Sequence, residues 1–316
     1  MKKIVYLLSA IGAAFAGTAH ADISVSGSAT STYASSDANQ YVNTSGGIAF
    51  ALSTTTAGGM GISAAGGITT DLEGTAARGS TGLTSLTFAT GGATIVIGND
   101  VAAPQIGNVG SVAGDMVDQG HQTINASPAV GTDADQDGSG ISLTTAVGGG
   151  SLTAVYVWDG SPSLSGKGQG NPDAADTSMG FSFSMPAGAA TVTLGHSTSD
   201  DTSSENDTLS GITVAYPAMG GTLSAGYQQS AGQTKATAIS AAYSMSLDAD
   251  TSLAIGIKSA DEGAQAASTT EAKISRALGG GASVYAEVKS SSGNSTGVTA
   301  SAGSSTTFAI GTSVAF

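Results

Sequence analysis

The chain contains no cysteine, and charged residues make up only 10% of its 316 residues. Without cysteine it has no disulfide bridges, no thiolate ligands for zinc and no cysteine nucleophile. A charged content so far below the usual value of about 25% is atypical of a soluble enzyme. Basic residues are especially few, nine against 23 acidic ones. Because nucleic-acid binding requires a basic surface, the composition argues against a nucleic-acid partner.

Long hydrophobic runs are also missing from the interior of the chain. After the first 21 residues, no stretch of 18 consecutive apolar residues is present. A transmembrane helix needs roughly 20 such residues. If the chain enters a membrane, we therefore expect it to do so as a β-barrel.

Residues 1–21 have the three parts of an export signal peptide. The segment begins with two lysines, continues with an apolar stretch and ends in Ala19-His20-Ala21, the small-x-small pattern that signal peptidase cuts. We therefore expect a cleaved signal peptide and a mature chain of residues 22–316 that works outside the cytoplasm. In that mature chain, seven basic residues face 23 acidic ones.

The chain is rich in glycine, and apolar and small or polar side chains alternate strictly along much of it. Over stretches of about ten residues every second side chain is apolar, as in Ile48, Phe50 and Leu52, and this period of two indicates strands with unlike faces. Seven tight glycine, proline or aspartate turns alternate along the chain with longer polar loops, and glycine supplies the positive φ of a tight hairpin. The longer loops include residues 101–139, 160–175, 200–207 and 260–270.

This pattern corresponds to about sixteen strands, seven short turns and eight long loops. It predicts an all-β fold, a 16-stranded antiparallel transmembrane β-barrel with short periplasmic turns and long extracellular loops. A bilayer offers no water to an unpaired sheet edge, so such a sheet must close. A soluble sandwich or a β-solenoid would accommodate the alternation but not the regular exchange of short and long connections.

The face opposite the large apolar residues is small and mildly polar. Ala49, Ala51 and Ser53 form this face on one expected strand. A packed interior needs bulk, because voids in a core are costly. About sixteen strands enclose a space too wide for side chains to fill, so this face predicts an aqueous channel.

The final strand has an apolar face that ends on an aromatic residue. Phe308, Ile310, Val314 and Phe316 share that face. A membrane interface gives the last ring a physical reason to be there. We assign these four residues as a C-terminal signal for barrel assembly and expect the barrel-assembly machinery as a partner.

The signal peptide, the sixteen strands, the long third loop and Phe316 together resemble a Gram-negative general diffusion porin of the alphaproteobacterial type. Residues 97–100 and 278–283 are the short stretches whose sequence is similar to that family. The resemblance implies a homotrimer in the outer membrane of a Gram-negative bacterium, in contact with lipid and lipopolysaccharide. It also implies a passive channel rather than an enzyme, with the third loop, about 101–139, folded into each pore.

Three lysines on adjacent strands are candidates for the pore constriction. By alternation with their apolar neighbours, Lys258, Lys273 and Lys289 face the lumen, together with Glu271 and Glu287. The alternative is an extracellular rim of solvated charges. A register slip of one residue would reverse every one of these assignments.

The third loop holds the acidic counterpart of these lysines. In the porin likeness its acids face basic residues on the wall, which makes Asp115 and Asp118 the best candidates opposite the lysines. Opposed charges set up a transverse field that orients dipolar solutes. Porins of this kind usually carry several arginines on their first strands, whereas residues 22–70 have none. With acids in excess, we expect mild cation selectivity.

The same loop contains a possible calcium site. Asp133, Asp135 and Asp137, followed by Gly138, resemble the first half of an EF-hand loop. Its twelfth position holds Thr144 instead of the bidentate glutamate, which rules out a complete EF-hand. The open alternatives are bound Ca²⁺ at the base of the loop and a solvated acidic turn. No cofactor is required by any other motif.

The function that follows is passive diffusion of small hydrophilic solutes and ions through a water-filled outer-membrane channel. No Ser, His and Asp set has the context of a catalytic motif, so we expect no enzyme activity. One alternative is a solute-selective channel on the same fold, although the single Trp158 offers little for an aromatic track. The other is a non-conducting surface β-protein or adhesin.

Overall fold

The computed structural model describes most of the chain after residue 20. The described residues are 21–36, 39–71, 79–99, 101, 106–109, 112, 139–158, 177–200, 207–231, 235–261, 266–293 and 305–316. The expected signal peptide lies outside them except for Ala21, which begins the first strand. None of the described residues belongs to a helix long and apolar enough to cross a membrane.

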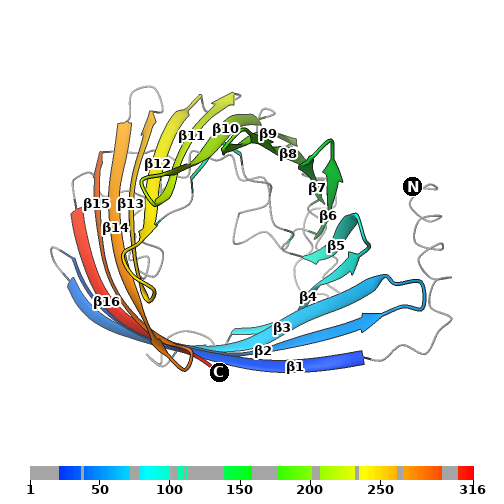
Figure 1. The fold of residues 1–316 in the computed structure, drawn as a ribbon, viewed down its shortest axis with the longest axis horizontal. Coiled ribbons are helices and arrows are strands. Elements are labelled where there is room, and N and C mark those ends of the chain that lie inside the picture. The colour runs from blue at the N-terminus through cyan, green and yellow to red at the C-terminus, as the bar shows by residue number, and fades with distance from the viewer. Residues whose placement is uncertain are drawn as a thin grey trace.

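Sixteen strands form the described part of the chain (Figure 1). In chain order they are β1 (Ala21–Ser36), β2 (Asn39–Thr55), β3 (Gly61–Asp71), β4 (Gly79–Ala89), β5 (Ala93–Asn99), β6 (Ser139–Val147), β7 (Gly150–Trp158), β8 (Thr177–Ala187), β9 (Ala190–Asp200), β10 (Asp207–Ala218), β11 (Gly221–Ala231), β12 (Thr237–Ser246), β13 (Thr251–Asp261), β14 (Ala266–Gly279), β15 (Ala282–Gly293) and β16 (Ser305–Ala315).

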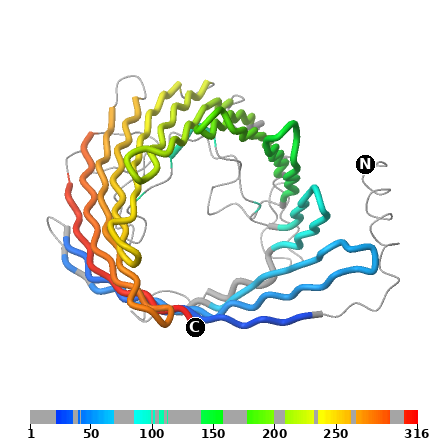
Figure 2. The backbone as a smooth tube through the Cα atoms, in the orientation of Figure 1, coloured from blue at the N-terminus to red at the C-terminus, as the bar shows by residue number. Residues whose placement is uncertain are grey.

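The strands close into a single antiparallel barrel. Each strand pairs with its neighbours in sequence, and β1 pairs with β16 to complete the ring. Figure 2 shows this ring as a tube, with the blue and red ends of the chain meeting along one seam. Closure pairs every strand on both sides, which removes the exposed edges that a membrane would not tolerate. The predicted 16-stranded antiparallel barrel is confirmed.

Short turns join alternate strand pairs, as the glycine pattern predicts. Gly148 and Gly149 connect β6 to β7 with φ values of 57° and 84°, the left-handed conformation that glycine adopts without strain. Asp248 shapes the turn between β12 and β13, where its Oδ1 accepts hydrogen bonds from the amides of Asp250 and Thr251. These bonds lower the pKa of the Asp248 carboxyl.

One of the expected long loops is shorter than predicted. Residues 260–270 were expected to form a loop, but β13 continues to Asp261 and β14 begins at Ala266. The polar residues at the start of β14 extend the ladder with β15, where the hydroxyl groups of Ser268 and Ser292 are 2.9 Å apart. Between the long strands β1 and β2, only residues 37–38 lie outside the ladder.

The outward face of the barrel carries the large apolar side chains. Ile23, Ile257 and Ile310 are 70%, 56% and 50% exposed, respectively, as expected for side chains that contact lipid. The inward face opposite them is not packed either. Ala49, Ala51 and Ser53 are exposed on the side of β2 opposite Ile48 and Phe50. A strand with both faces accessible is typical of a barrel around an open channel.

Candidate functional site

The connection between β5 and β6 reaches the inner wall of the barrel. Its described residues 106–109 and 112 form what we call the wall-bound segment. In Figure 1, the teal trace of this region lies inside the ring of strands, next to β10–β12. Ile106 is only 7% exposed, which indicates that the segment packs against the wall.

Contacts with the four consecutive strands β10 to β13 hold the wall-bound segment. Gly107 lies so close to β10 and β11 that a Cβ atom on Gly211 would be 2.6 Å from the Cα of Gly107. The amide of Val109 donates a hydrogen bond of 2.9 Å to Oγ of Ser240 on β12. The side chain of Val112 lies over Gly256 on β13. These residues all lie on the face opposite the lipid-facing side chains, so they mark the inner wall.

The structure brings the three predicted lysines together on this wall. We call Lys258, Glu271, Lys273, Glu287 and Lys289 the β13–β15 charge cluster. The β14–β15 register places Glu271 opposite Lys289 and Lys273 opposite Glu287. Lys258 lies opposite Thr269 on the β13–β14 ladder, two residue pairs beyond the pair of Gly256 and Glu271.

Both carboxylates of the charge cluster are buried, and each interacts with a neighbouring donor or cation. Oε2 of Glu271 accepts a hydrogen bond of 2.8 Å from the amide of Val112. Oε2 of Glu287 lies 3.9 Å from Nζ of Lys273, whose ammonium also lies 4.8 Å from the centre of the Tyr285 ring. Each glutamate is only 2% exposed, whereas the three lysines are more accessible. The face that the cluster turns to the lumen is therefore positively charged.

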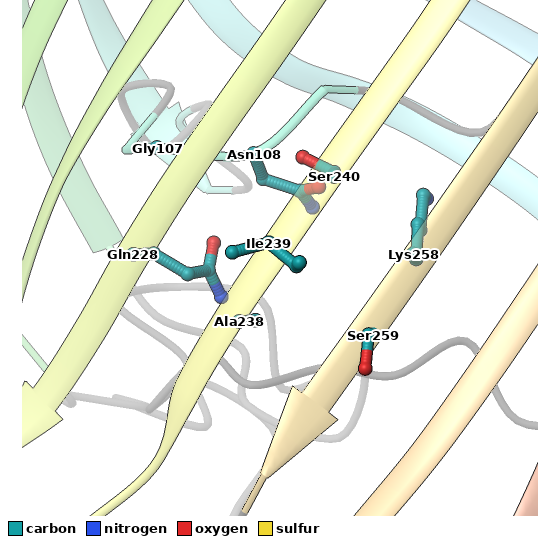
Figure 3. Close-up of a pocket in the computed structure, with 8 residues that line it drawn as sticks. All are labelled: Gly107, Asn108, Gln228, Ala238, Ile239, Ser240, Lys258 and Ser259. Atoms are coloured by element: carbon teal, nitrogen blue, oxygen red, sulfur yellow. The ribbon is translucent and has the colours of Figure 1, made fainter.

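A small pocket lies between residues 107–108 of the wall-bound segment and Lys258 of the charge cluster (Figure 3). Asn108 and Lys258 line it from the loop and from β13, and Gln228 and Ser240 line it from β11 and β12. Figure 3 shows Gln228, Ser240 and Lys258 on three neighbouring strands, with Asn108 of the loop beside Ser240. Lys258 thus lies beside the third loop.

The acidic residues predicted for the third loop lie outside the described residues. This applies to Asp115 and Asp118, and to the possible calcium ligands Asp133, Asp135 and Asp137. Within the described ranges, no group of three His, Asp or Glu side chains is placed to hold a metal ion.

The four residues assigned to the assembly signal lie at the closure of the barrel. Phe308, Ile310 and Val314 belong to the outward face of β16, and each is at least 41% exposed. Phe316 follows β16 and exchanges two backbone hydrogen bonds with Gly27 on β1, of 2.7 and 2.9 Å. Its ring lies directly over Gly27.

Sequence reasoning did not single out Gly107, Ser240 or Tyr285. Val109 and Ser240 are 131 residues apart in sequence, and no local motif marks such a contact. A weak signal for the Gly107 contact was available in Gly211 and Gly226, because glycine in a strand interior often marks close approach of another backbone.

Comparison with known proteins places this barrel in a family. The chain is similar in structure to OmpT of Vibrio cholerae in its trimer form, with a TM-score of 0.65, 14% identity and coverage of 94% of this chain and 99% of that one. For the anion-selective porin of Comamonas acidovorans, the TM-score is 0.65 and the identity 15%, with coverage of 94% and 100%. For a variant of the Rh. blastica porin, the TM-score is 0.63 and the identity 14%, with coverage of 93% of this chain and 100% of that one.

At these identities the structural likeness shows the fold alone, and no curated protein sequence matches the chain. The family described as Gram-negative porin, however, matches residues 8–296, which is most of the chain. The family and the closed barrel together point to the outer membrane. The chain belongs to the Gram-negative porin family and is an outer-membrane porin.

Proposed function

We propose that this porin is a water-filled channel for passive diffusion of small hydrophilic solutes and ions, without catalytic activity. The observation that carries the proposal is the inner face of the barrel. Small residues such as Ala49, Ala51 and Ser53 are accessible there, inside a closed ring of sixteen strands. A ring of this size is too wide to be filled by such side chains.

We propose that opposed charges at the level of the third loop give the pore a mild preference for cations. The lysines of the β13–β15 charge cluster supply a positive wall, and the aspartates of the third loop, Asp115 and Asp118 foremost, supply the negative side. The 23 acidic residues of the mature chain outnumber its seven basic ones, which favours a negative average potential. The Comamonas porin is described as anion-selective, so the sign depends on each chain's own charges.

We further propose that the protein is a homotrimer. The trimer form of the Vibrio cholerae OmpT supports this assembly. The proposal also includes cleavage of residues 1–21, for which their export-signal pattern is the support. Insertion by the barrel-assembly machinery and contact with outer-membrane lipid and lipopolysaccharide are further parts of it, supported by the apolar face of β16 and by the porin family. Chemical cross-linking of the purified protein would test it, and a single monomer band would contradict the trimer.

Current through the purified protein in a planar bilayer under a KCl gradient tests the channel and its selectivity. We expect openings in groups of three and a reversal potential that favours K⁺. Lys258→Gln and Lys289→Gln each remove a wall charge and should raise the K⁺ preference about twofold. A unit charge about 5 Å from an ion is worth about 0.8 kcal/mol in water before screening.

Lys235→Gln is the matched control, because Lys235 lies between β11 and β12, outside the charge cluster. It should leave the reversal potential unchanged. A reversal potential that favours Cl⁻ would overturn the cation preference while leaving the channel intact. Absence of conductance from heat-modifiable, folded protein would overturn the channel itself.

A further inference from the structure

We propose that a glycine notch in the inner wall, together with Ser240 and Glu271, is the anchor that fixes the third loop at its height in the pore. In this proposal Glu271 is a positioning residue for the loop. The glycine notch consists of Gly107 on the loop, Gly211 on β10 and Gly226 on β11. The inference rests on the proposed channel function, because the position of the loop matters only if solutes pass it.

The glycine notch exists only because all three residues lack a side chain. A Cβ atom on Gly226 would lie 2.5 Å from the carbonyl oxygen of Gly107, and one on Gly211 would lie 2.6 Å from its Cα. Gly107 itself has a φ of +64°, which strains any residue with a Cβ. Two constraints of different origin therefore require glycine at the same contact.

The cost of these glycines supports a specific role. Glycine in a strand interior is less favourable than alanine by roughly 0.5–1 kcal/mol. Gly211 and Gly226 both carry that cost on the inner face, where alanine is common in this chain. Their benefit is contact between two backbones, which brings the loop against the wall.

Hydrogen bonds extend the anchor from the notch toward β14. The amides of Val109 and Val112 donate to Ser240 and to Glu271, at 2.9 and 2.8 Å. An amide–carboxylate bond is charge-assisted and stronger than a neutral one. Between these two points, a Cβ on Gly256 would lie 3.2 Å from Cγ2 of Val112. The anchor thus spans the strands from β10 to β14 in order.

An engineered disulfide tests the position of the loop independently of any current. Val112→Cys combined with Gly256→Cys places two thiols at the contact where a Cβ on Gly256 would lie 3.2 Å from Cγ2 of Val112, and the chain has no other cysteine. We expect an intramolecular disulfide on mild oxidation, seen by mass spectrometry of the folded protein. Absence of the disulfide in folded protein would overturn the placement of the anchor.

Two substitutions test the role of the anchor in the channel. Gly226→Ala introduces the methyl group that the notch excludes, and Glu271→Ala removes the acceptor for Val112. We expect both to lower the voltage at which the channel closes and to make the open current unsteady. Gly61→Ala is the control for the first, because the nearest atom to a Cβ on this strand glycine is 3.8 Å away.

Glu271→Gln separates positioning from charge, because the amide oxygen still accepts the hydrogen bond. We expect Glu271→Gln to close at the same voltage as the wild type and Glu271→Ala to close at a lower voltage. Adding the cysteine pair to Glu271→Ala should restore the wild-type closing voltage when oxidised and lose it again on reduction. A Glu271→Gln channel as unsteady as Glu271→Ala would overturn the positioning role.

The outcomes distinguish this inference from the proposed function. If the Val112→Cys, Gly256→Cys variant forms the disulfide but the wild-type protein carries no current, the channel is contradicted and the anchor stays in place. A conducting wild type whose closure is unchanged in both Gly226→Ala and Glu271→Ala contradicts the anchor and leaves the channel. If Gly226→Ala fails to fold, the Glu271 variants and the rescue by the disulfide still test whether the anchor positions the loop.

Discussion

At the scale of single residues, Tyr285 shows how one side chain can connect strands that are far apart in sequence. It starts on β15, passes over Gly311 on β16 and hydrogen-bonds through its hydroxyl to Thr32 on β1. Lys273 on β14 lies over the same ring. Tyr285 and Thr32 are only 7% and 5% exposed. Four strands on both sides of the β1–β16 seam therefore meet at one aromatic residue.

Removal of the Tyr285 hydroxyl should weaken this seam. Tyr285→Phe keeps the ring and its contact with Gly311, but it leaves the buried hydroxyl of Thr32 without this partner. We expect a loss of about 1 kcal/mol in the free energy of unfolding, measured by urea titration in detergent micelles. Tyr216→Phe, on an outward and 49% exposed residue, is the control and should be neutral. Equal stabilities of the two variants would argue against the seam role of Tyr285.

At the scale of the elements, the two-residue period was sufficient to predict most of the strands. The alternation also predicted which way Lys258 and Lys273 point, because side-chain direction in a strand follows from parity alone. It failed at both ends of 260–270: residues 260–261 belong to β13, and residues 267–270 look like part of a loop but pair with β15. No periodicity reports the contact between Gly107 and Gly226, since that contact depends on a loop crossing the finished barrel.

The short turns provide a prediction at the same scale. Gly149 has a φ of +84°, and nothing lies within 4 Å of the position of its Cβ, so its backbone conformation alone requires glycine. Gly149→Ala should therefore lower the free energy of unfolding by about 1 kcal/mol. Gly91→Ala is the matched control, in a short turn with equally open space but without a positive φ. The same urea titration compares them, and a neutral Gly149→Ala would show that this turn tolerates the strain.

At the scale of the whole molecule, the barrel depends on the pairing that closes it. Fifteen of the sixteen strand pairs join neighbours in sequence, and only β1–β16 brings the two ends of the chain together. This pairing is long-range, so the entropy of closing the ring must be offset by the contacts made at the seam. Tyr285 supplies such a contact on the inner face, and Phe316 supplies one on the outer face, where its ring covers Gly27.

The outer contact leads to a prediction about the complete barrel. Phe316→Ala uncovers Gly27 while keeping the two backbone bonds between these residues, and the loss of an aromatic ring over a strand glycine should cost about 1 kcal/mol. Because that loss falls on the pairing that closes the ring, we expect less folded, heat-modifiable protein in SDS gels of outer membranes. Phe308→Ala, on the same outward face of β16 but away from Gly27, controls for the removal of a lipid-facing ring. If both variants reduce the folded fraction equally, the effect belongs to the lipid contact of β16, and Phe316 has no special part in closure.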